Sequence, residues 1–181
     1  MRNILLLVDM QNGFIAQNHE CKELEPRISG LLESKVFDAV MATRFLNNPN
    51  SIYERLLDWH GMESTMEQAI PSEYRNHIDI VMDKQVYNGA SDESIRMLCR
   101  LNDGMLPSQV FIVGMDTDAC VLTTAVGLFE HGIRPIVLTR YCASGGGHDH
   151  HNARLSCLRR LIGDGQLSDV VMTAGTDISA L

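Results

Sequence analysis

Short apolar segments recur along the chain, and each is followed by a longer segment in which apolar and polar residues are mixed. The apolar segments are too short for helices, and several are apolar at nearly every position, which is typical of strands covered on both faces. We predict strands at Ile4–Val8, Val36–Ala42, Ile78–Met82, Val110–Val113, Pro135–Thr139 and Val170–Met172. Because the intervening segments are long enough for crossover helices, the pattern predicts an α/β fold with a parallel sheet.

Helical periodicity and capping residues predict helices between these strands. One helix follows Ser91, whose hydroxyl can cap it, and another runs from Cys120 to His131, with Thr117 and Asp118 as cap residues and Gly132 as its terminator. We also expect helices at His151–Ile162 and, within a less regular stretch, at Ile52–Trp59.

Ligands of open parallel sheets bind at the carboxyl ends of the strands, near the point where the strand order reverses. This rule selects the polar residues that directly follow the apolar segments. They are Asp9, Thr43, Arg44, Asp83, Lys84, Asp116–Cys120 and Arg140–Ser144.

Cys120 is the candidate nucleophile among these residues. It follows a strand and a turn and begins an apolar helix, so that backbone N–H groups and the positive end of the helix dipole favour its thiolate. The alternative is that a cysteine at a helix start is a small buried hydrophobe, as we expect for the other four cysteines.

Asp9 and Lys84 are the candidate acid–base and cationic partners. Asp9 follows the run ILLLV, where an apolar surrounding would let it exchange protons near neutral pH, although it could instead cap the next helix. Lys84 taken alone could be an ordinary exposed lysine. A thiol, a carboxyl group and an amine at three separate strand ends are what thiol-dependent acyl transfer requires.

Three motifs carry a family resemblance. They are LLLVDMQNGF (Leu5 to Phe14), DKQVYNGAS (Asp83 to Ser91) and GMDTDACVLTTAVGLFEHGIRPIVL (Gly114 to Leu138), which occur in this order and span most of the chain. The sequence resembles the isochorismatase-like cysteine hydrolases, which include nicotinamidases and N-carbamoylsarcosine amidases.

The resemblance implies a single domain over residues 1–181 with a three-layer α/β/α architecture. Its six-stranded, mainly parallel, Rossmann-like sheet would have the order 3-2-1-4-5-6. Cys120 would be the nucleophile, Asp9 the proton shuttle and Lys84 the cation that stabilises the thiolate. A cis peptide between Met115 and Asp116 would direct the N–H groups of Asp116 and Cys120 at one oxyanion.

The substrate-binding residues are predicted from position and resemblance. Phe14, Tyr87 and Trp59 would line the pocket, Arg44 could bind a substrate carboxylate, and Tyr141 stands where the family often has an aspartate. An aromatic residue near a strand end is as often part of the core.

The sequence departs from the nicotinamidase pattern. The Asp-x-His metal motif of that group is replaced by Ala42–Leu46, so we expect neither a metal nor another cofactor, and Asp116 stands where the family commonly has a small apolar residue. We expect His148–His151 to form a flexible loop rather than a metal site. Gly145–Gly147 lacks the frame of a phosphate-binding loop.

Charge and cysteine content narrow the partners and the compartment. With 15 Lys and Arg against 23 Asp and Glu, the net charge of −8 disfavours nucleic acid. The five cysteines contain no CxxC pair, which favours a reducing cytoplasm over a disulfide framework. We expect no signal peptide, no membrane span, a small-molecule substrate and a homo-oligomer, either a dimer or a tetramer.

The sequence therefore predicts a metal-independent cysteine hydrolase that cleaves a C–N bond of a small carboxamide or ureido compound through a thioester on Cys120. One alternative is an isochorismate-type vinyl ether hydrolase, in which protonation of a carbon matters more than a thiolate. The other is a family member that has lost catalysis and acts as a binding protein.

Overall fold

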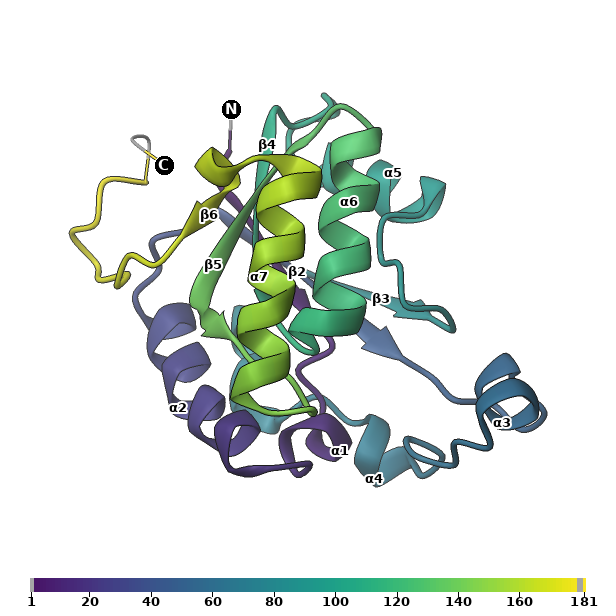
Figure 1. Cartoon of the computed structure of the whole chain (residues 1–181). Coiled ribbons are helices and arrows are strands. Elements are labelled where there is room, and N and C mark those ends of the chain that lie inside the picture. Colours follow the sequence, from purple (N-terminus) through teal and green to yellow (C-terminus); the bar gives the residue numbers. More distant parts are fainter. Residues whose placement is uncertain (1, 179–180) are drawn as a thin grey trace.

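A six-stranded sheet forms the centre of the computed structural model, which describes residues 2–178 and 181 (Figure 1). The strands lie in the order β3-β2-β1-β4-β5-β6, and every neighbouring pair is parallel, which confirms the predicted fold class. Their bounds are β1 Ile4–Val8, β2 Ala39–Phe45, β3 Ile80–Lys84, β4 Gln109–Gly114, β5 Arg134–Cys142 and β6 Leu167–Ser168.

Several strand boundaries differ from the sequence prediction. β2 starts three residues later than expected because its register is set by pairing, with Ala39 opposite Ile4 of β1. The predicted strand at Val170–Met172 is wrong, since β6 comes earlier and pairs Leu167 with Val137 of β5.

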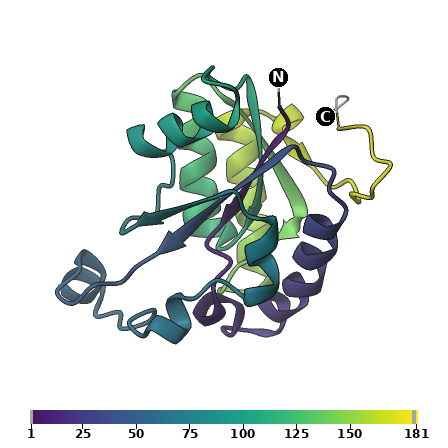
Figure 2. The same ribbon diagram turned by 180° about the vertical axis from the view of Figure 1, so that it is seen from behind.

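Helices cover both faces of the sheet, as the uninterrupted apolar strands require. One face packs against α5 (Asp92–Leu101), α6 (Leu122–Glu130) and α7 (His148–Ile162), and the other packs mainly against α2 (His19–Glu33). Alternate residues of β1 enter the two cores, with Ile4 and Leu6 on the first face and Leu5 and Leu7 on the second. Figures 1 and 2 show these two faces from opposite sides.

The predicted caps and helix ends show mixed outcomes. Ser91 caps α5 by accepting a hydrogen bond from the Ser94 N–H, and Gly132 follows α6 with a φ of 75°, both as predicted. α7 begins at His148, three residues before the predicted start, so the flexible loop expected for His148–His151 is wrong.

Short elements surround the carboxyl edge of the sheet. They are α1 (Asn12–Ile15), α3 (Ile52–Leu57), α4 (Thr65–Gln68), the 3-10 turns Ser72–His77 and Asp164–Gln166, and a π-helical turn at Thr117–Val121. α3 projects from the body of the molecule beyond β2 (Figure 1). The site described below lies at this edge, where β1 and β4 adjoin and the strand order reverses.

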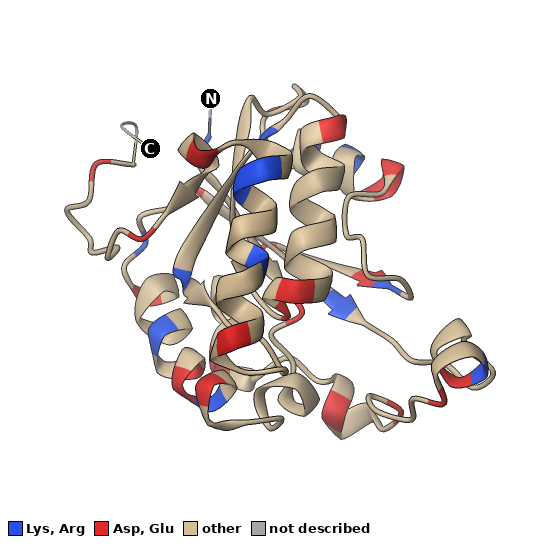
Figure 3. Ribbon diagram, viewed as in Figure 1, with Lys and Arg blue, Asp and Glu red and all other residues tan. Residues whose placement is uncertain are grey.

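Charged residues are distributed over many elements. Figure 3 shows Lys and Arg interspersed with Asp and Glu rather than gathered along one helix. A search of the described residues found no helix that is both long and apolar enough to span a membrane.

Candidate active site

Asp9, Lys84 and Cys120 come from three different elements and meet at the carboxyl edge of the sheet. The Lys84 Nζ atom lies 2.6 Å from Asp9 Oδ2 and 3.5 Å from Cys120 Sγ. The side chains of Lys84 and Asp9 are 3% and 0% exposed, so this is a buried ion pair beside a thiol.

The backbone and a neighbouring hydroxyl fix the position of Asp9. Its φ of 47° turns the chain sharply after β1. The Asp9 N–H donates to Thr43 Oγ1 at 3.1 Å, and the Thr43 hydroxyl donates to Asp9 Oδ1 at 2.6 Å. Thr43 therefore orients the carboxylate so that Oδ2 faces Lys84.

The Lys84 ammonium has partners besides Asp9 and Cys120. It donates to the carbonyl oxygens of Val86 at 2.9 Å and Tyr87 at 3.2 Å, and it lies 5.3 Å from the centre of the Phe45 ring. Buried charges are tolerated when their remaining donors and acceptors are satisfied in this way.

Cys120 lies inside the π-helical turn Thr117–Val121, which leads directly into α6. The predicted capping by Thr117 and Asp118 is wrong, because neither side chain caps this helix. Thr117 instead donates to the Ala143 carbonyl oxygen, and Asp118 accepts a hydrogen bond from the Ser144 hydroxyl. Both side chains thus tie the cysteine turn to the segment that follows β5.

Two histidines at the start of α7 add to this connection. His151 Nδ1 lies 2.8 Å from Thr117 Oγ1, and His150 Nδ1 lies 3.3 Å from Asp118 Oδ2. Burial lowers the pKa of His151, which favours a neutral imidazole against the Thr117 hydroxyl.

The structure corrects the expectation that the surroundings of Cys120 favour its thiolate. Burial raises the pKa of the Cys120 thiol well above its usual value, the charge of Asp9 raises it further, and the Lys84 ammonium opposes these effects. These effects favour the thiol form of the resting Cys120, with the carboxyl group of Asp9 beside it.

The Asp116 peptide unit organises the backbone of the cysteine turn. The peptide bond between Met115 and Asp116 is cis, and the Asp116 carbonyl oxygen accepts from the N–H groups of Ala119 and Val121, on either side of Cys120. Among the described residues, the Asp116 N–H donates no backbone hydrogen bond. It is free to bind an oxygen atom of a ligand.

The thiol opens onto a cavity of about 290 Å³. Three residues that were predicted to line the pocket, Phe14, Trp59 and Tyr87, do line it. The other lining residues are Gln17, Phe45, Tyr53, Leu57, Asp116, Ala119 and Cys120. Sequence reasoning missed Gln17, Phe45, Tyr53 and Leu57 as wall residues. Phe45 could have been suspected because it ends β2, but no sequence signal indicates that α3 turns Tyr53 toward the thiol.

Arg44 and Tyr141 do not line this cavity. Arg44 makes a bidentate ion pair with Asp83, at 2.7 and 2.8 Å, and borders a separate depression with Thr65 and Arg75. Tyr141 is 6% exposed and packs in the core on the α2 side of the sheet, where its hydroxyl oxygen accepts from the Met172 N–H. Their positions do not support the predicted role of either residue in substrate binding.

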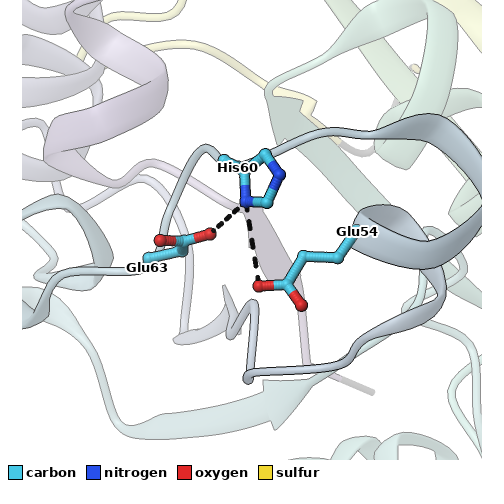
Figure 4. A group of neighbouring side chains, drawn as sticks. All are labelled: Glu54, His60 and Glu63. Carbon is cyan, nitrogen blue, oxygen red and sulfur yellow. Dashed lines mark hydrogen bonds and ion pairs between the residues drawn. The ribbon is translucent and has the colours of Figure 1, made fainter.

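A group of side chains outside the cavity could hold a metal ion. Ligand atoms of Glu54, His60 and Glu63 lie within 4.8 Å of one another (Figure 4), the one such group found among the described residues. Asp58 also faces His60, with Oδ1 at 3.3 Å from Nε2. Hydrogen bonds that the His60 ring donates to Glu63 and to Asp58 raise the pKa of His60, which favours its imidazolium form. The cluster links the two ends of the segment that carries Leu57 and Trp59.

The donor set of the cavity does not suit a metal ion beside Cys120. The described residues that line it include no histidine and one carboxylate, that of Asp116. Sites that hold zinc combine several histidine, cysteine or carboxylate ligands around one point.

Comparison with known proteins places the chain in a family. A family model described as an isochorismatase domain matches residues 3–166. No match was found among curated proteins.

Solved structures show the same fold. An isochorismatase-like hydrolase from Alkaliphilus metalliredigens superposes with a TM-score of 0.78 at 18% identity, covering 99% of both chains. A nicotinamidase/pyrazinamidase from Bacillus subtilis gives 0.76 at 21% identity, covering 93% of this chain and 100% of the other. An N-carbamoylsarcosine amidase from Thermoplasma acidophilum gives 0.76 at 21% identity, covering 98% of this chain and 99% of the other.

Proposed function

The chain belongs to the isochorismatase family of hydrolases, and on that premise we propose that it hydrolyses the C–N bond of a small carboxamide or ureido compound through a thioester on Cys120. The observation that carries the proposal is the contact of Lys84 Nζ with both Asp9 Oδ2 and Cys120 Sγ, at the wall of one cavity. A buried base, a cation and a thiol, with the unpaired N–H group of Asp116 in the same turn, are parts that acyl transfer needs.

The first half-reaction forms the thioester. Asp9 accepts the proton of the Cys120 thiol, and the sulfur attacks the carbonyl carbon of the substrate. The oxygen of the tetrahedral intermediate accepts hydrogen bonds from the N–H groups of Asp116 and Cys120. The C–N bond then breaks, and Asp9 gives its proton to the departing nitrogen, which leaves as ammonia or an amine.

The second half-reaction releases the acid. A water molecule gives a proton to Asp9 and attacks the thioester carbon, with the same N–H groups stabilising the oxyanion. The C–S bond breaks, the carboxylic acid leaves, and the sulfur takes the proton back from Asp9. A ureido substrate would give a carbamic acid, which loses carbon dioxide.

Lys84 supports both steps without changing its protonation. Its ammonium compensates the charge on Asp9 while Asp9 is a carboxylate, and it lies beside the sulfur when the negative charge moves there. The raised pKa of Cys120 fits this order of events, since the thiol would lose its proton as the attack begins.

Vinyl ether hydrolysis is the weaker candidate. Isochorismate is a dicarboxylate, and Arg44 was the residue predicted to bind such a group, but it is paired with Asp83 outside the cavity. No Lys or Arg belongs to the described residues that line the cavity, and Asp116 would repel a carboxylate there.

The proposed chemistry is tested by incubating the protein with a panel of small amides and ureas and measuring released ammonia. Cys120→Ala should abolish turnover, and a brief incubation of wild type should leave an acyl adduct on the Cys120 peptide in mass spectrometry. Asp118→Asn is the matched control, because it alters the same turn without touching the thiol. Full activity of Cys120→Ala would overturn the mechanism, and a chain that turns over no member of the panel would favour the binding-protein alternative.

Two further expectations remain open to direct measurement. Turnover should survive dialysis against a chelator, since the cavity residues offer no metal site. Sedimentation velocity would test the predicted dimer or tetramer.

A further inference from the structure

The charged groups at the cavity have an unusual balance for a site that binds a small metabolite. Among the described lining residues, Asp116 is the only one with a formal charge at neutral pH, since the raised pKa of Cys120 favours its neutral thiol. Lys84 lies behind the thiol and is paired with Asp9, so its positive charge does not balance Asp116. The wall of the cavity therefore carries one uncompensated negative charge.

The surroundings of Asp116 disfavour the charged form of its side chain. Burial raises its pKa to about 6, against the effect of a hydrogen bond from the Gly145 N–H, and the charges of Asp118 and Asp9 add to the rise. At neutral pH it is still mostly a carboxylate. Its Oδ1 atom accepts from the Gly145 N–H at 2.9 Å, which an asparagine could do without a charge. The hydrogen bond with Gly145 therefore does not explain why residue 116 is an aspartate and not an asparagine.

Aromatic rings form most of the remaining wall. Tyr53 is nearly perpendicular to Phe45 and to Tyr87, with ring centres 5.1 and 5.0 Å apart, and Trp59 meets Tyr53 at 69° with centres 6.0 Å apart. Rings arranged edge to face enclose a space from several sides instead of stacking on one another. The faces of aromatic rings attract cations, and several rings around one point form the usual receptor for substituted ammonium groups.

We propose that the substrate is a small amide that carries a cationic, alkylated ammonium group, which lies against the aromatic rings and pairs with the Asp116 carboxylate. This inference rests on the proposed function for the amide and adds the chemical class of the remainder of the molecule. A cavity of about 290 Å³ limits that remainder to a few carbon atoms. The net charge of −8 on the whole chain also favours the approach of a cation over that of an anion.

An isosteric pair of ligands tests the inference by binding alone. Betaine amide carries a trimethylammonium group, and tert-butylacetamide has the same shape with carbon in place of nitrogen. Trp59 is the only tryptophan in the chain and lines the cavity, so its fluorescence reports binding. The titrations use Cys120→Ala to prevent turnover.

Betaine amide should bind at least about ten-fold more tightly than tert-butylacetamide, because its cation, which has no N–H to donate, is attracted both by the Asp116 charge and by the aromatic rings. Asp116→Asn in the same background should reduce that ratio to about three or less. Asp118→Asn removes a carboxylate two residues away that does not line the cavity, and it should leave the ratio unchanged.

Equal affinities, tighter binding of tert-butylacetamide, no binding of betaine amide, or an unchanged ratio in Asp116→Asn would each overturn the inference. These outcomes are independent of turnover. If neutral amides are hydrolysed through Cys120 while the binding ratio stays near one, the proposed function stands and the cationic substrate is wrong. If betaine amide binds selectively but no amide is turned over by the wild type, the site binds cations and the proposed hydrolysis is wrong.

Discussion

Replacing Asp116 with asparagine should make the protein more stable at neutral and alkaline pH. The carboxylate is partly buried and is subject to the charges of Asp118 and Asp9, and burial is the main reason that its pKa rises from the ordinary value of 3.8 to about 6. An asparagine has nearly the same shape, can still accept from the Gly145 N–H and carries no charge. The substitution therefore removes an unfavourable charge and retains the contact.

The two pKa values set the size and the pH range of the effect. Below both values Asp116 is protonated in the folded and the unfolded chain and contributes nothing. Between about pH 4 and about pH 6 the folded state keeps a proton that the unfolded state has lost, so the free energy of unfolding falls as pH rises. The total loss is about 3 kcal/mol, taken from the difference between 3.8 and about 6, and it is complete above about pH 7.

Urea denaturation followed by circular dichroism at two pH values measures this effect. Asp116→Asn should exceed wild type by about 1 kcal/mol at about pH 4.5 and by about 3 kcal/mol at about pH 8, as an upper limit. Asp118→Asn is the control, and it should gain nothing because its carboxylate has a hydroxyl donor and a histidine partner. An equal gain for Asp116→Asn at both pH values, or a loss at about pH 8, would refute the reasoning.

Four other substitutions or titrations give further predictions. Lys84→Met should lower the free energy of unfolding by about 3–5 kcal/mol by leaving Asp9 buried without its cation, and adding Asp9→Asn should recover part of it in a double-mutant cycle. Gly114→Ala should lower the free energy of unfolding by about 3 kcal/mol in urea denaturation, because Gly114 has a φ of 119° and a Cβ there would collide with the Val8 carbonyl oxygen. Gly30 has open space around it, so the control Gly30→Ala should be neutral or stabilising. Tyr53→Phe should raise the free energy of unfolding by up to about 1 kcal/mol, because the buried hydroxyl makes no hydrogen bond of normal geometry to a described residue. A lower free energy of unfolding in the same assay would show that the hydroxyl has a hydrogen-bond partner. An NMR titration should give His60 a pKa above 6.5, so that its ion pairs are complete below that pH and are lost as pH rises through the raised pKa; a value at or below 6.5 would contradict the carboxylate cluster.

Much of the fold could be read from the sequence because strands buried on both faces leave a strong signal. The run Ile4–Val8 is apolar at every position, and it forms the fully buried strand β1 at the predicted bounds. α2 was less visible: its buried residues, Cys21, Leu24, Ile28, Leu31 and Leu32, have helical spacing, but Pro26 lies among them. Proline interrupts helix hydrogen bonding and so obscures the pattern in sequence.

The sequence also determined which chemical groups stand at the strand ends, since Asp9, Lys84 and Cys120 each follow or end an apolar run. The sequence could not determine to which side of the sheet the residues around these groups point. Thr43 and Arg44 are adjacent in β2, yet Thr43 bonds to Asp9 whereas Arg44 pairs with Asp83 away from the cavity. Successive side chains of a strand alternate between faces, so a shift of one residue in register exchanges their roles.

Phe14, Trp59 and Tyr87 were predicted at the cavity from the sequence, but tertiary structure decided other parts of its wall. Gln17 and Tyr53 are far from Cys120 in sequence, and each lines the cavity only because of where its own turn or helix lies against the sheet. Local sequence specifies a helix by its caps and periodicity, whereas packing against distant residues decides which of its side chains faces a ligand. The sequence by itself therefore determined the reacting groups, and the tertiary structure decided the charge and shape of the space that a substrate must fit.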